Sequence, residues 1–291
     1  MRQIISHLIP SKVKVKLRKG QRVLQSAPRI SYEAYRFLEY HAGVRLGWRD
    51  PLVPPDWLPS VGSTDFVETG DEFFQYFINL AKLEPAETIL DVGCGTGRMA
   101  RPLTKYLKAG CYDGIDIVAP SIEWCQKTYG GRCPGFHFHT ADVYNKAYNP
   151  TGKYSASQYQ FPFEEDSFDF VFLTSVFTHM LPEDMENYLS EIVRVLKKGG
   201  RCLVTYFLLG SDSFELMEKN ASDFAFRYEL PGCHVDSAET PEAAVAYDEN
   251  RVRELYRKHN LSIWEPIRYG SWCGRETGLS YQDIVIAAKP F

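Results

Sequence analysis

The chain lacks several features that mark membrane, disulfide-rich and metal proteins. No apolar stretch approaches the roughly 18 residues of a membrane span, and the longest candidates, 168–177 and 202–209, have the length of strands. The seven cysteines are scattered without a C-x-x-C pair, which argues against a disulfide framework and a structural zinc site. No cluster of His, Asp and Glu has metal-ligand spacing. We therefore expect a metal-free protein in a reducing, cytoplasmic setting.

Acidic residues are missing before Glu33, whereas eight basic residues precede it: Arg2, Lys12, Lys14, Lys16, Arg18, Lys19, Arg22 and Arg29. The whole chain has a formal charge of −4, so the remainder carries about −12 once these eight charges are set apart. An acidic body has no broad basic face, and we expect no nucleic-acid partner. Residues 1–28 form a basic arm without the cleavage site of a signal peptide. The arm is either a solvated tail or a peripheral contact for a membrane surface or a partner.

Strand-like and helix-like segments alternate after about Asp71. Apolar runs predict strands at 88–91, 114–117, 136–139, 168–174, 202–209, 262–269 and 283–288. Helical spacing predicts helices at 73–80, 98–107, 121–129, 183–196 and 248–258, with a kink at Pro102. This alternation is typical of a doubly wound α/β fold with a mainly parallel sheet.

The regular pattern occupies only part of the chain. Residues 29–70 combine a predicted helix at 32–44 with a proline-rich connector, and we expect the main domain to cover 71–291. Two long stretches, 143–166 and 219–247, interrupt the alternation. Insertions of this length in a compact domain often serve as functional lids. The run Lys197–Gly200, with its cations and glycines, is expected to end the preceding helix in a turn.

The clearest chemical signal is the segment 89–100, ILDVGCGTGRMA, in which a predicted strand runs into a glycine-rich turn and then a helix. Glycines allow the backbone to approach a ligand closely. The spacing G-x-G-x-G differs from the G-x-G-x-x-G of dinucleotide-binding proteins. Asp91 would repel a pyrophosphate but attract the ammonium group of S-adenosylmethionine (SAM). The motif therefore favours SAM over a nicotinamide cofactor.

Polar side chains lie at the carboxyl ends of the next three predicted strands. Asp116 can accept hydrogen bonds from both ribose hydroxyls, and Asp142 can accept one from the adenine amino group. Thr174 and Ser175 end the fourth strand, beside the expected position of the sulfur. A single Asp is as easily a helix cap or a turn residue. Three at successive strand ends, together with the glycine turn, favour a ligand site.

Over roughly residues 70–290 the chain resembles the class I SAM-dependent methyltransferases. The matching stretches are ILDVGCGTGRMA (89–100), YDGIDIVAPSIEWC (112–125), TADVYN (140–145), FDFVFLTSVFTHML (168–181) and EIVRVLKKGGRCLVTYF (191–207). The resemblance implies a Rossmann-like, seven-stranded sheet whose last strand is antiparallel. It further implies cofactor contacts from Asp91, Gly93, Cys94, Gly95 and Gly97 at the methionine end, from Asp116 and Ile117 at the ribose, from Asp142 and Val143 at the adenine, and from Thr174 and Ser175. The SVFTHM stretch and the LKKGG turn are similar to a bacterial branch that modifies small molecules and cell-surface glycans.

Methyl transfer to oxygen requires alignment of the acceptor and usually a base. His179, a few residues after the fourth strand, is the leading candidate, because imidazole suits proton removal near neutral pH. A packing or helix-start histidine is the alternative reading. His234, in the second insertion, is a second candidate. His137 and His139 alternate along a strand and are interpreted as structural, with His139 near the adenine.

Acceptor contacts are expected from the loop 270–275 and from the first insertion. Trp272 offers aromatic surface, and Arg275 can pair with a carboxylate or phosphate or remain an exposed cation. The tyrosines of the insertion either roof the site or serve in packing: Tyr144, Tyr148, Tyr154 and Tyr159. We expect a hydroxyl acceptor on a small molecule or glycan, with S-adenosylhomocysteine (SAH) as product. A non-catalytic SAM-binding scaffold and a nicotinamide oxidoreductase are the alternatives.

Overall fold

The computed structural model describes residues 31–58, 65–219 and 222–291. The chain forms two compact units, Met1–Pro51 and Leu52–Phe291. The predicted basic arm lies outside the described residues. In the first unit, α2 (Tyr32–Arg45) confirms the helix expected there, and the Ser31 hydroxyl caps it by accepting a hydrogen bond from the Ala34 N–H at 3.2 Å. Within the described ranges, no helix has the length and apolarity that crossing a bilayer requires.

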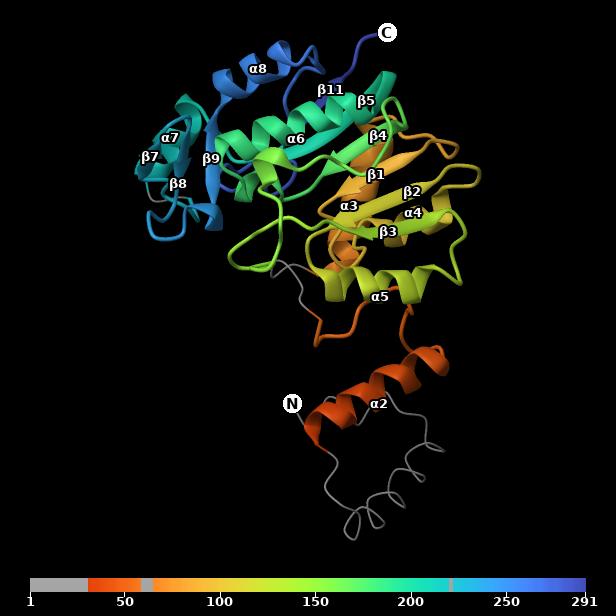
Figure 1. The fold of residues 1–291 in the computed structure, drawn as a ribbon. Coiled ribbons are helices and arrows are strands. Elements are labelled where there is room, and N and C mark those ends of the chain that lie inside the picture. Colours follow the sequence, from red (N-terminus) through yellow and green to blue (C-terminus); the bar gives the residue numbers. More distant parts are fainter. Residues whose placement is uncertain (1–30, 59–64, 220–221) are drawn as a thin grey trace. The chain divides into compact units, whose positions relative to one another are not determined.

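A seven-stranded sheet forms the centre of the second unit (Figure 1). Its strands are β1 (Ile89–Val92), β2 (Tyr112–Asp116), β3 (Phe136–Thr140), β4 (Phe168–Leu173), β5 (Leu196–Tyr206), β10 (Ser262–Ile263) and β11 (Asp283–Ala288). They are ordered β10-β11-β5-β4-β1-β2-β3. Strands β1 to β5 pair in parallel, while β11 runs antiparallel to both β5 and β10. The predicted seven-stranded sheet with an antiparallel last strand is confirmed.

Helices cover both faces of this sheet. One face packs against α3 (Phe66–Asn79), α4 (Ala100–Tyr106) and α5 (Ala119–Tyr129), and the other against α6 (Pro182–Val195) and α8 (Glu249–Lys258). Strand β4 shows the cause, since Phe170 and Phe172 belong to the first apolar layer and Val171 and Leu173 to the second. Alternating side chains of a fully buried strand serve both layers.

Most element boundaries agree with the periodicity, and the exceptions have local causes. Helix α4 begins only at Ala100, so Pro102 lies in its first turn, where a missing N–H leaves no helical hydrogen bond unmade. Asp248 caps α8 as expected, accepting from the Arg251 N–H at 3.1 Å. The expected turn at 197–200 is instead the bulged start of β5, with Gly199 at φ 76°. The predicted strand 262–269 is reduced to the two residues of β10.

The second insertion is not irregular, contrary to expectation. It contains β7 (Tyr228–Leu230), β8 (Cys233–Val235) and β9 (Val245–Asp248). These strands join β6 (Leu208–Leu209) in a four-stranded sheet ordered β6-β9-β8-β7, with α7 (Ser211–Glu218) beside it (Figure 1). The predicted strand 202–209 is therefore split at Phe207. The Leu208 N–H donates to the Asp283 carboxylate at 2.7 Å rather than continuing the main ladder.

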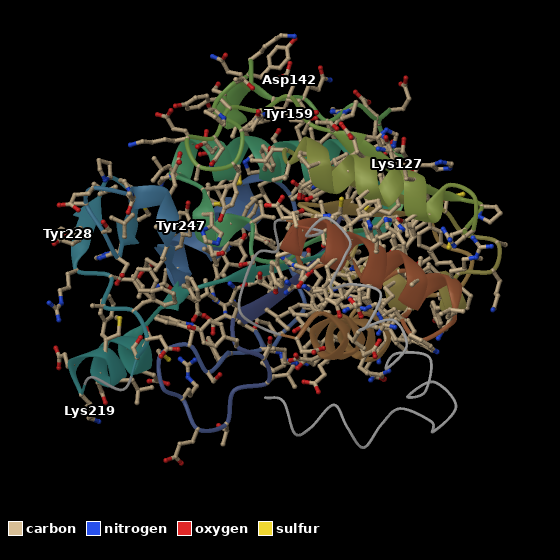
Figure 2. All side chains as sticks on the ribbon, turned by 90° about the horizontal axis from the view of Figure 1, so that it is seen from below. Lys127, Asp142, Tyr159, Lys219, Tyr228 and Tyr247 are labelled. Atoms are coloured by element: carbon tan, nitrogen blue, oxygen red, sulfur yellow. The ribbon has the colours of Figure 1, made fainter. Side chains whose placement is uncertain are left out.

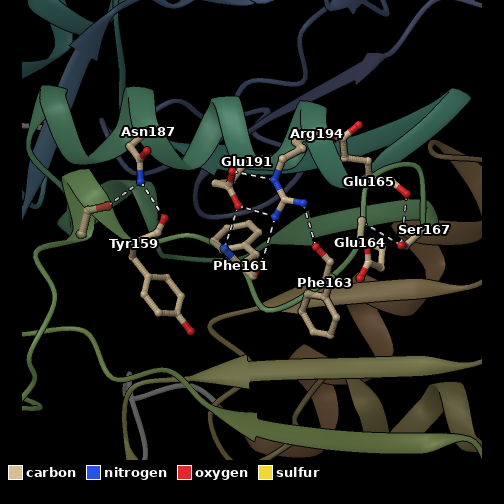
Figure 3. A network of polar contacts seen from close by, with 10 residues as sticks. Tyr159, Phe161, Phe163, Glu164, Glu165, Ser167, Asn187, Glu191 and Arg194 are labelled. Carbon is tan, nitrogen blue, oxygen red and sulfur yellow. Dashed lines mark hydrogen bonds and ion pairs between the residues drawn. The ribbon is translucent and has the colours of Figure 1, made fainter.

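Part of the first insertion is hydrogen-bonded to side chains of α6, as Figure 3 shows. Arg194 donates to the carbonyls of Phe161 and Phe163 at 2.9 and 2.8 Å and pairs with Glu191 at 2.6 Å. Glu191 in turn accepts from the Phe161 N–H at 2.7 Å. Asn187 Nδ2 donates to the carbonyl of Ala156 in the short helix Ala156–Gln158 and to that of Tyr159, which follows the helix. These contacts argue against a segment that opens freely.

Candidate functional site

The glycine turn follows β1 at the edge where the parallel strands end. Gly93, Gly95 and Gly97 have φ values of 84°, 52° and 76°, a region that side chains other than glycine rarely adopt. A Cβ on Gly93 would lie 2.4 Å from Val176 Cγ2, and one on Gly97 would lie 2.9 Å from the Tyr129 hydroxyl. At Gly95 the same position is open space. The turn is thus packed at both ends and open in the middle, where a ligand can approach the backbone.

Asp91, the third residue of β1, is buried beneath this turn and is only 1% exposed. Its Oδ2 accepts a hydrogen bond from the Tyr112 hydroxyl at 2.6 Å, while Oδ1 has no hydrogen-bond partner among the described residues. Burial is the main cause that raises the pKa of this carboxyl to about 8; the Tyr112 hydrogen bond opposes the rise and the nearby Asp116 contributes to it. A buried, unpartnered carboxylate oxygen fits the ammonium group of SAM, which supplies both charge and hydrogen bonds.

Asp116 ends β2 and also shapes the glycine turn. Its Oδ2 accepts from the Gly95 N–H at 2.7 Å and its Oδ1 from the Val118 N–H at 2.8 Å. Burial raises the pKa of this carboxyl, and the backbone donors oppose that rise. Each carboxylate oxygen keeps a further lone pair, so both can still accept from a ribose hydroxyl. The ribose contact remains a prediction. The bond to Gly95 is a second role that the sequence did not indicate.

Two expected cofactor neighbours lie in apolar packing. Cys94 is 5% exposed, and its Sγ lies 3.9 Å from the Gly95 carbonyl oxygen. Cys125 on α5 reaches the same carbonyl at 3.7 Å. Burial raises the pKa of the Cys94 thiol well above its ordinary value, so this group packs beneath the turn and is not activated as a nucleophile. Ile117 is half-buried and packs against the apolar layer under α6.

The Asp142 carboxylate is engaged by the first insertion. It accepts from the Lys153 N–H at 3.2 Å and forms an ion pair with Lys153 Nζ at 3.3 Å. The buried Val143 forms a bridge to Tyr154. Asp142 and Tyr159 appear in the same region of Figure 2; burial raises the pKa of the Tyr159 hydroxyl, and the charge of Asp142 adds to that rise. The adenine contacts of Asp142 and Val143 remain predictions.

Thr174 and Ser175 follow β4, as expected, and both are half-buried. Ser175 has a φ of 60°, which is uncommon for a residue with a side chain. Its N–H donates to Thr205 Oγ1 at 2.7 Å, and its hydroxyl oxygen accepts from Gln282 Nε2 at 2.9 Å.

His179 lies in a short 3-10 helix, Phe177–His179, and is half-buried. Its Nδ1 is 3.1 Å from the backbone carbonyl oxygen of Glu242, in the second insertion. A carbonyl only accepts, so Nδ1 carries the proton in the neutral ring and Nε2 carries the lone pair. His234 lies elsewhere, on β8 of the four-stranded sheet, with its ring 6.2 Å from that of Phe214.

The residues of the loop 270–275 that were expected to contact the acceptor make contacts within the protein instead. Trp272 is 0% exposed and donates from Nε1 to Asp283 at 2.7 Å, so it offers no surface to an acceptor. Arg275 donates to the Gly270 carbonyl at 2.9 Å and lies over the Tyr269 ring at 4.9 Å. Tyr144, by contrast, is 51% exposed and is accessible from solvent.

The remaining tyrosines of the first insertion and the two histidines of β3 differ in their exposure. Tyr148 and Tyr154 are exposed, whereas Tyr159 is buried. His137 is exposed on β3, and His139 Nε2 lies 2.9 Å from the Asp113 carboxylate.

Several residues of the site carried no signal in the sequence. Tyr112 lay just before the predicted strand 114–117, and Thr205, Gln282 and Glu242 lie far along the chain from the groups they contact. The one available clue was alternation, which places Tyr112 and Gly114 on the same face of β2.

Comparison with known proteins agrees with this geometry. A family model described as a methyltransferase domain matches residues 90–204. The chain is 31% identical over 163 residues to a phthiotriol/phenolphthiotriol dimycocerosates methyltransferase of Mycobacterium tuberculosis, covering 54% of this chain and 51% of that protein. It is 26% identical over 205 residues to a fatty-acid O-methyltransferase of Mycolicibacterium smegmatis, covering 68% and 65%.

The chain thus spans about half the length of the first of these relatives. Among solved structures, the PH0226 protein of Pyrococcus horikoshii superposes with a TM-score of 0.52 at 17% identity, covering 81% of this chain and 96% of that one, and so shares the fold. Residues 90–204 thus match a methyltransferase domain, and the mainly parallel seven-stranded sheet with its glycine turn has the Rossmann-like fold expected for such a domain.

Proposed function

We propose that this protein binds SAM and transfers its methyl group to a hydroxyl oxygen of a small-molecule, lipid-like or glycan acceptor. The observation that carries the proposal is the buried Asp91, whose Oδ1 is unpartnered within the described structure beside the open middle of the glycine turn. The names of the curated relatives, which include a fatty-acid O-methyltransferase, support an oxygen acceptor of lipid-like chemistry.

The bound SAM would supply a methyl group that its sulfonium charge already activates. The residues of this chain would bind and orient it. Asp91 would accept the ammonium group, and Asp116 would accept the ribose hydroxyls through the lone pairs left by Gly95 and Val118. A nicotinamide cofactor is less well served, because its pyrophosphate would lie beside two acidic groups.

His179 would take the proton of the acceptor hydroxyl at Nε2. The Glu242 carbonyl supports this role, since it holds Nδ1–H and leaves Nε2 as the basic atom. The imidazolium formed by the transfer would keep the same hydrogen bond, so the product of the proton transfer is stabilised without rearrangement. The second insertion would therefore orient the base as well as border the acceptor.

A peripheral contact with an anionic membrane is the second part of the proposal. Three aromatic side chains of the first unit are strongly exposed: Tyr32 at 73%, Tyr35 at 62% and Trp48 at 70%. Trp and Tyr are the residues enriched at membrane interfaces, and the eight basic residues before Glu33 provide charge complementarity. A lipid-like acceptor would be reached at such a surface.

Titration calorimetry with SAM and SAH, with NADH as control, tests the cofactor assignment. We expect adenosyl ligands to bind in the micromolar range and NADH not to bind. Asp91→Asn, which keeps the shape but removes the charge, should weaken SAH binding by about 2 kcal/mol, the contribution of a hydrogen bond to a charged group. Binding of NADH alone would refute the assignment. Adenosyl binding without transfer of labelled methyl to any extract component would favour a non-catalytic scaffold.

A further inference from the structure

A closed ring of hydrogen bonds joins three strands at the carboxyl end of β4. The Ser175 N–H donates to Thr205 Oγ1 at 2.7 Å, and the Thr205 hydroxyl donates to Gln282 Oε1 at 2.6 Å. Gln282 Nε2 then donates to the Ser175 hydroxyl oxygen at 2.9 Å, which completes the ring. Ser175 follows β4, Thr205 lies in β5, and Gln282 immediately precedes β11.

The direction of each bond in the ring is determined. A backbone N–H can only donate, so Thr205 must accept it and use its own proton toward Gln282. The Gln282 amide therefore presents its oxygen to Thr205 and its nitrogen to Ser175. Thr205 is 0% exposed and Gln282 is half-buried, so water competes weakly for these bonds.

The ring holds a strained residue. Ser175 is in the left-handed region with φ 60°, where a side chain is disfavoured and persists only when its surroundings enforce it. Two of the three bonds of the ring end on Ser175, one on its backbone and one on its side chain. Gln282 and Thr205 enforce this conformation through the ring, and Thr178 Oγ1 lies 3.4 Å from the Ser175 hydroxyl oxygen.

The conformation of Ser175 bears directly on the glycine turn. The next residue, Val176, lies so close to the turn that a Cβ on Gly93 would come within 2.4 Å of Val176 Cγ2. Gly93 is two residues from Asp91, the group assigned to the ammonium. A change at Ser175 would therefore move a side chain that packs on the cofactor turn.

We infer that Gln282 is a positioning residue for the adenosyl ligand: it holds Ser175 in the left-handed conformation and thereby keeps Val176 against Gly93. Gln282 acts through Ser175 and is assigned no contact with the ligand. The inference rests on the proposed function, because it concerns affinity for SAM and SAH. The acceptor need not be known for its test.

The test is SAH affinity by titration calorimetry, with thermal unfolding recorded for each variant. Gln282→Leu, which opens the ring, should weaken SAH binding at least tenfold. Adding Ser175→Gly to Gln282→Leu should recover at least threefold of that loss, because glycine adopts φ 60° without enforcement. Gln75→Leu, at an exposed glutamine of α3 that bonds Asn79, is the matched control and should bind within twofold of the unaltered chain.

Three further variants serve if Gln282→Leu does not fold. Gln282→Glu replaces the donating amide nitrogen by a second oxygen acceptor, so the ring can close with the Ser175 hydroxyl donating, and SAH affinity should stay within threefold. Ser175→Ala should bind SAH more weakly than Ser175→Gly, because both lack the hydroxyl but only alanine is strained at this φ. Equal losses of SAH affinity in Ser175→Ala and Ser175→Gly would overturn the inference.

The inference and the proposed function fail in different ways. If the unaltered chain binds no SAH, the proposed function is wrong. If it binds SAH and Gln282→Leu binds equally well, or Ser175→Gly restores nothing, the positioning role is wrong while the cofactor assignment stands.

Discussion

The carboxyl group of Asp91 holds a proton at neutral pH before a ligand binds, because burial raises its pKa to about 8. In the unfolded chain the same group titrates near its ordinary value of 3.8. Between about pH 4 and pH 8 the folded state binds one more proton at Asp91 than the unfolded chain does. The stability that this proton contributes is therefore full below about pH 4 and is lost as the pH rises through about 8.

The first prediction concerns that pH window. Asp91→Asn removes the titrating group, so the variant should gain thermal stability relative to the unaltered chain as the pH rises from about 5 to about 8. Thermal unfolding at several pH values measures the difference. A difference that does not change with pH would mean that Asp91 titrates normally.

The second prediction concerns ligand binding at the same carboxyl. An ammonium group beside Asp91 favours the charged form, so SAH binding at pH 6.5 should release close to one proton. Calorimetry in two buffers of different ionisation enthalpy measures the number of protons released. The Asp91→Asn variant is the control and should release none from this position; an equal release in both proteins would contradict the assignment.

The third prediction concerns His179. Replacing this base by Gln should lower the rate of methyl transfer by about 10²–10⁴-fold, the usual contribution of a positioned base. SAH affinity should change little, because the imidazole is assigned to the acceptor. Labelled SAM and an acceptor fraction measure the rate, and calorimetry measures the affinity. His234→Gln, on the outer sheet, separates the two candidates: if it abolishes transfer and His179→Gln does not, the base was misassigned.

At the scale of elements, an ion pair between the buried Arg201 and the half-buried Glu87 connects β5 to the segment before β1. Arg201 is 5% exposed; both of its terminal nitrogens bond the Glu87 carboxylate at 2.6 Å, and it donates to the Ala81 and Asp169 carbonyls. Removing one partner of such a pair leaves the other uncompensated in a dry environment. The loss of either Arg201 or Glu87 should therefore lower the free energy of unfolding.

The fourth prediction uses this pair. Arg201→Met should lower the free energy of unfolding by about 3–5 kcal/mol. Lys127→Met provides the contrast, since Lys127 on α5 lies at the surface (Figure 2), 3.6 Å from an exposed Glu123, and its loss should cost under about 1 kcal/mol. Chemical denaturation measures both. Similar losses of unfolding free energy in the two variants would show that burial does not determine how much an ion pair stabilises this protein.

The elements that the sequence predicted well are those whose signal is local. Helix α6 and strand β4 were found almost to the residue, because apolar periodicity and an uninterrupted apolar run belong to one segment. The second insertion was misread because β7, β8 and β9 are only three or four residues long and are stabilised by pairing with one another. Such pairing is not a property of any single segment.

The same distinction applies to the site. Asp91, the glycines and Asp116 could be proposed as site residues because they lie at or just after the ends of strands at a recognisable spacing, and their cofactor contacts remain predictions. The Tyr112–Asp91 bond, the Glu242 carbonyl on His179 and the Gln282 ring join residues that are 21, 63 and 107 positions apart. Trp272 was expected at the acceptor for its aromatic surface, yet its indole is buried and donates a hydrogen bond to the buried Asp283 carboxylate.

At the scale of the whole molecule, the fifth prediction concerns membrane association. The full chain should sediment with vesicles that contain phosphatidylserine and not with pure phosphatidylcholine vesicles, and added salt should weaken the binding. Trp48→Ala should reduce it, whereas Trp264→Ala, at a partly exposed tryptophan of the second unit, should not. Equal sedimentation with both kinds of vesicle would refute an electrostatic surface contact.

The four-stranded sheet leaves and rejoins the main domain at one place, since β6 and β9 pair in parallel with Leu208 beside Tyr247 and Leu209 beside Asp248. The residues between them form a cassette whose two ends are neighbours, while Asp91, Asp116 and the glycine turn lie outside it. We therefore expect that replacing this cassette as one block would change the Glu242 carbonyl on His179 without disturbing the strands that carry Asp91 and Asp116. Selection on acceptor choice and selection on cofactor binding would then act on separate parts of the chain.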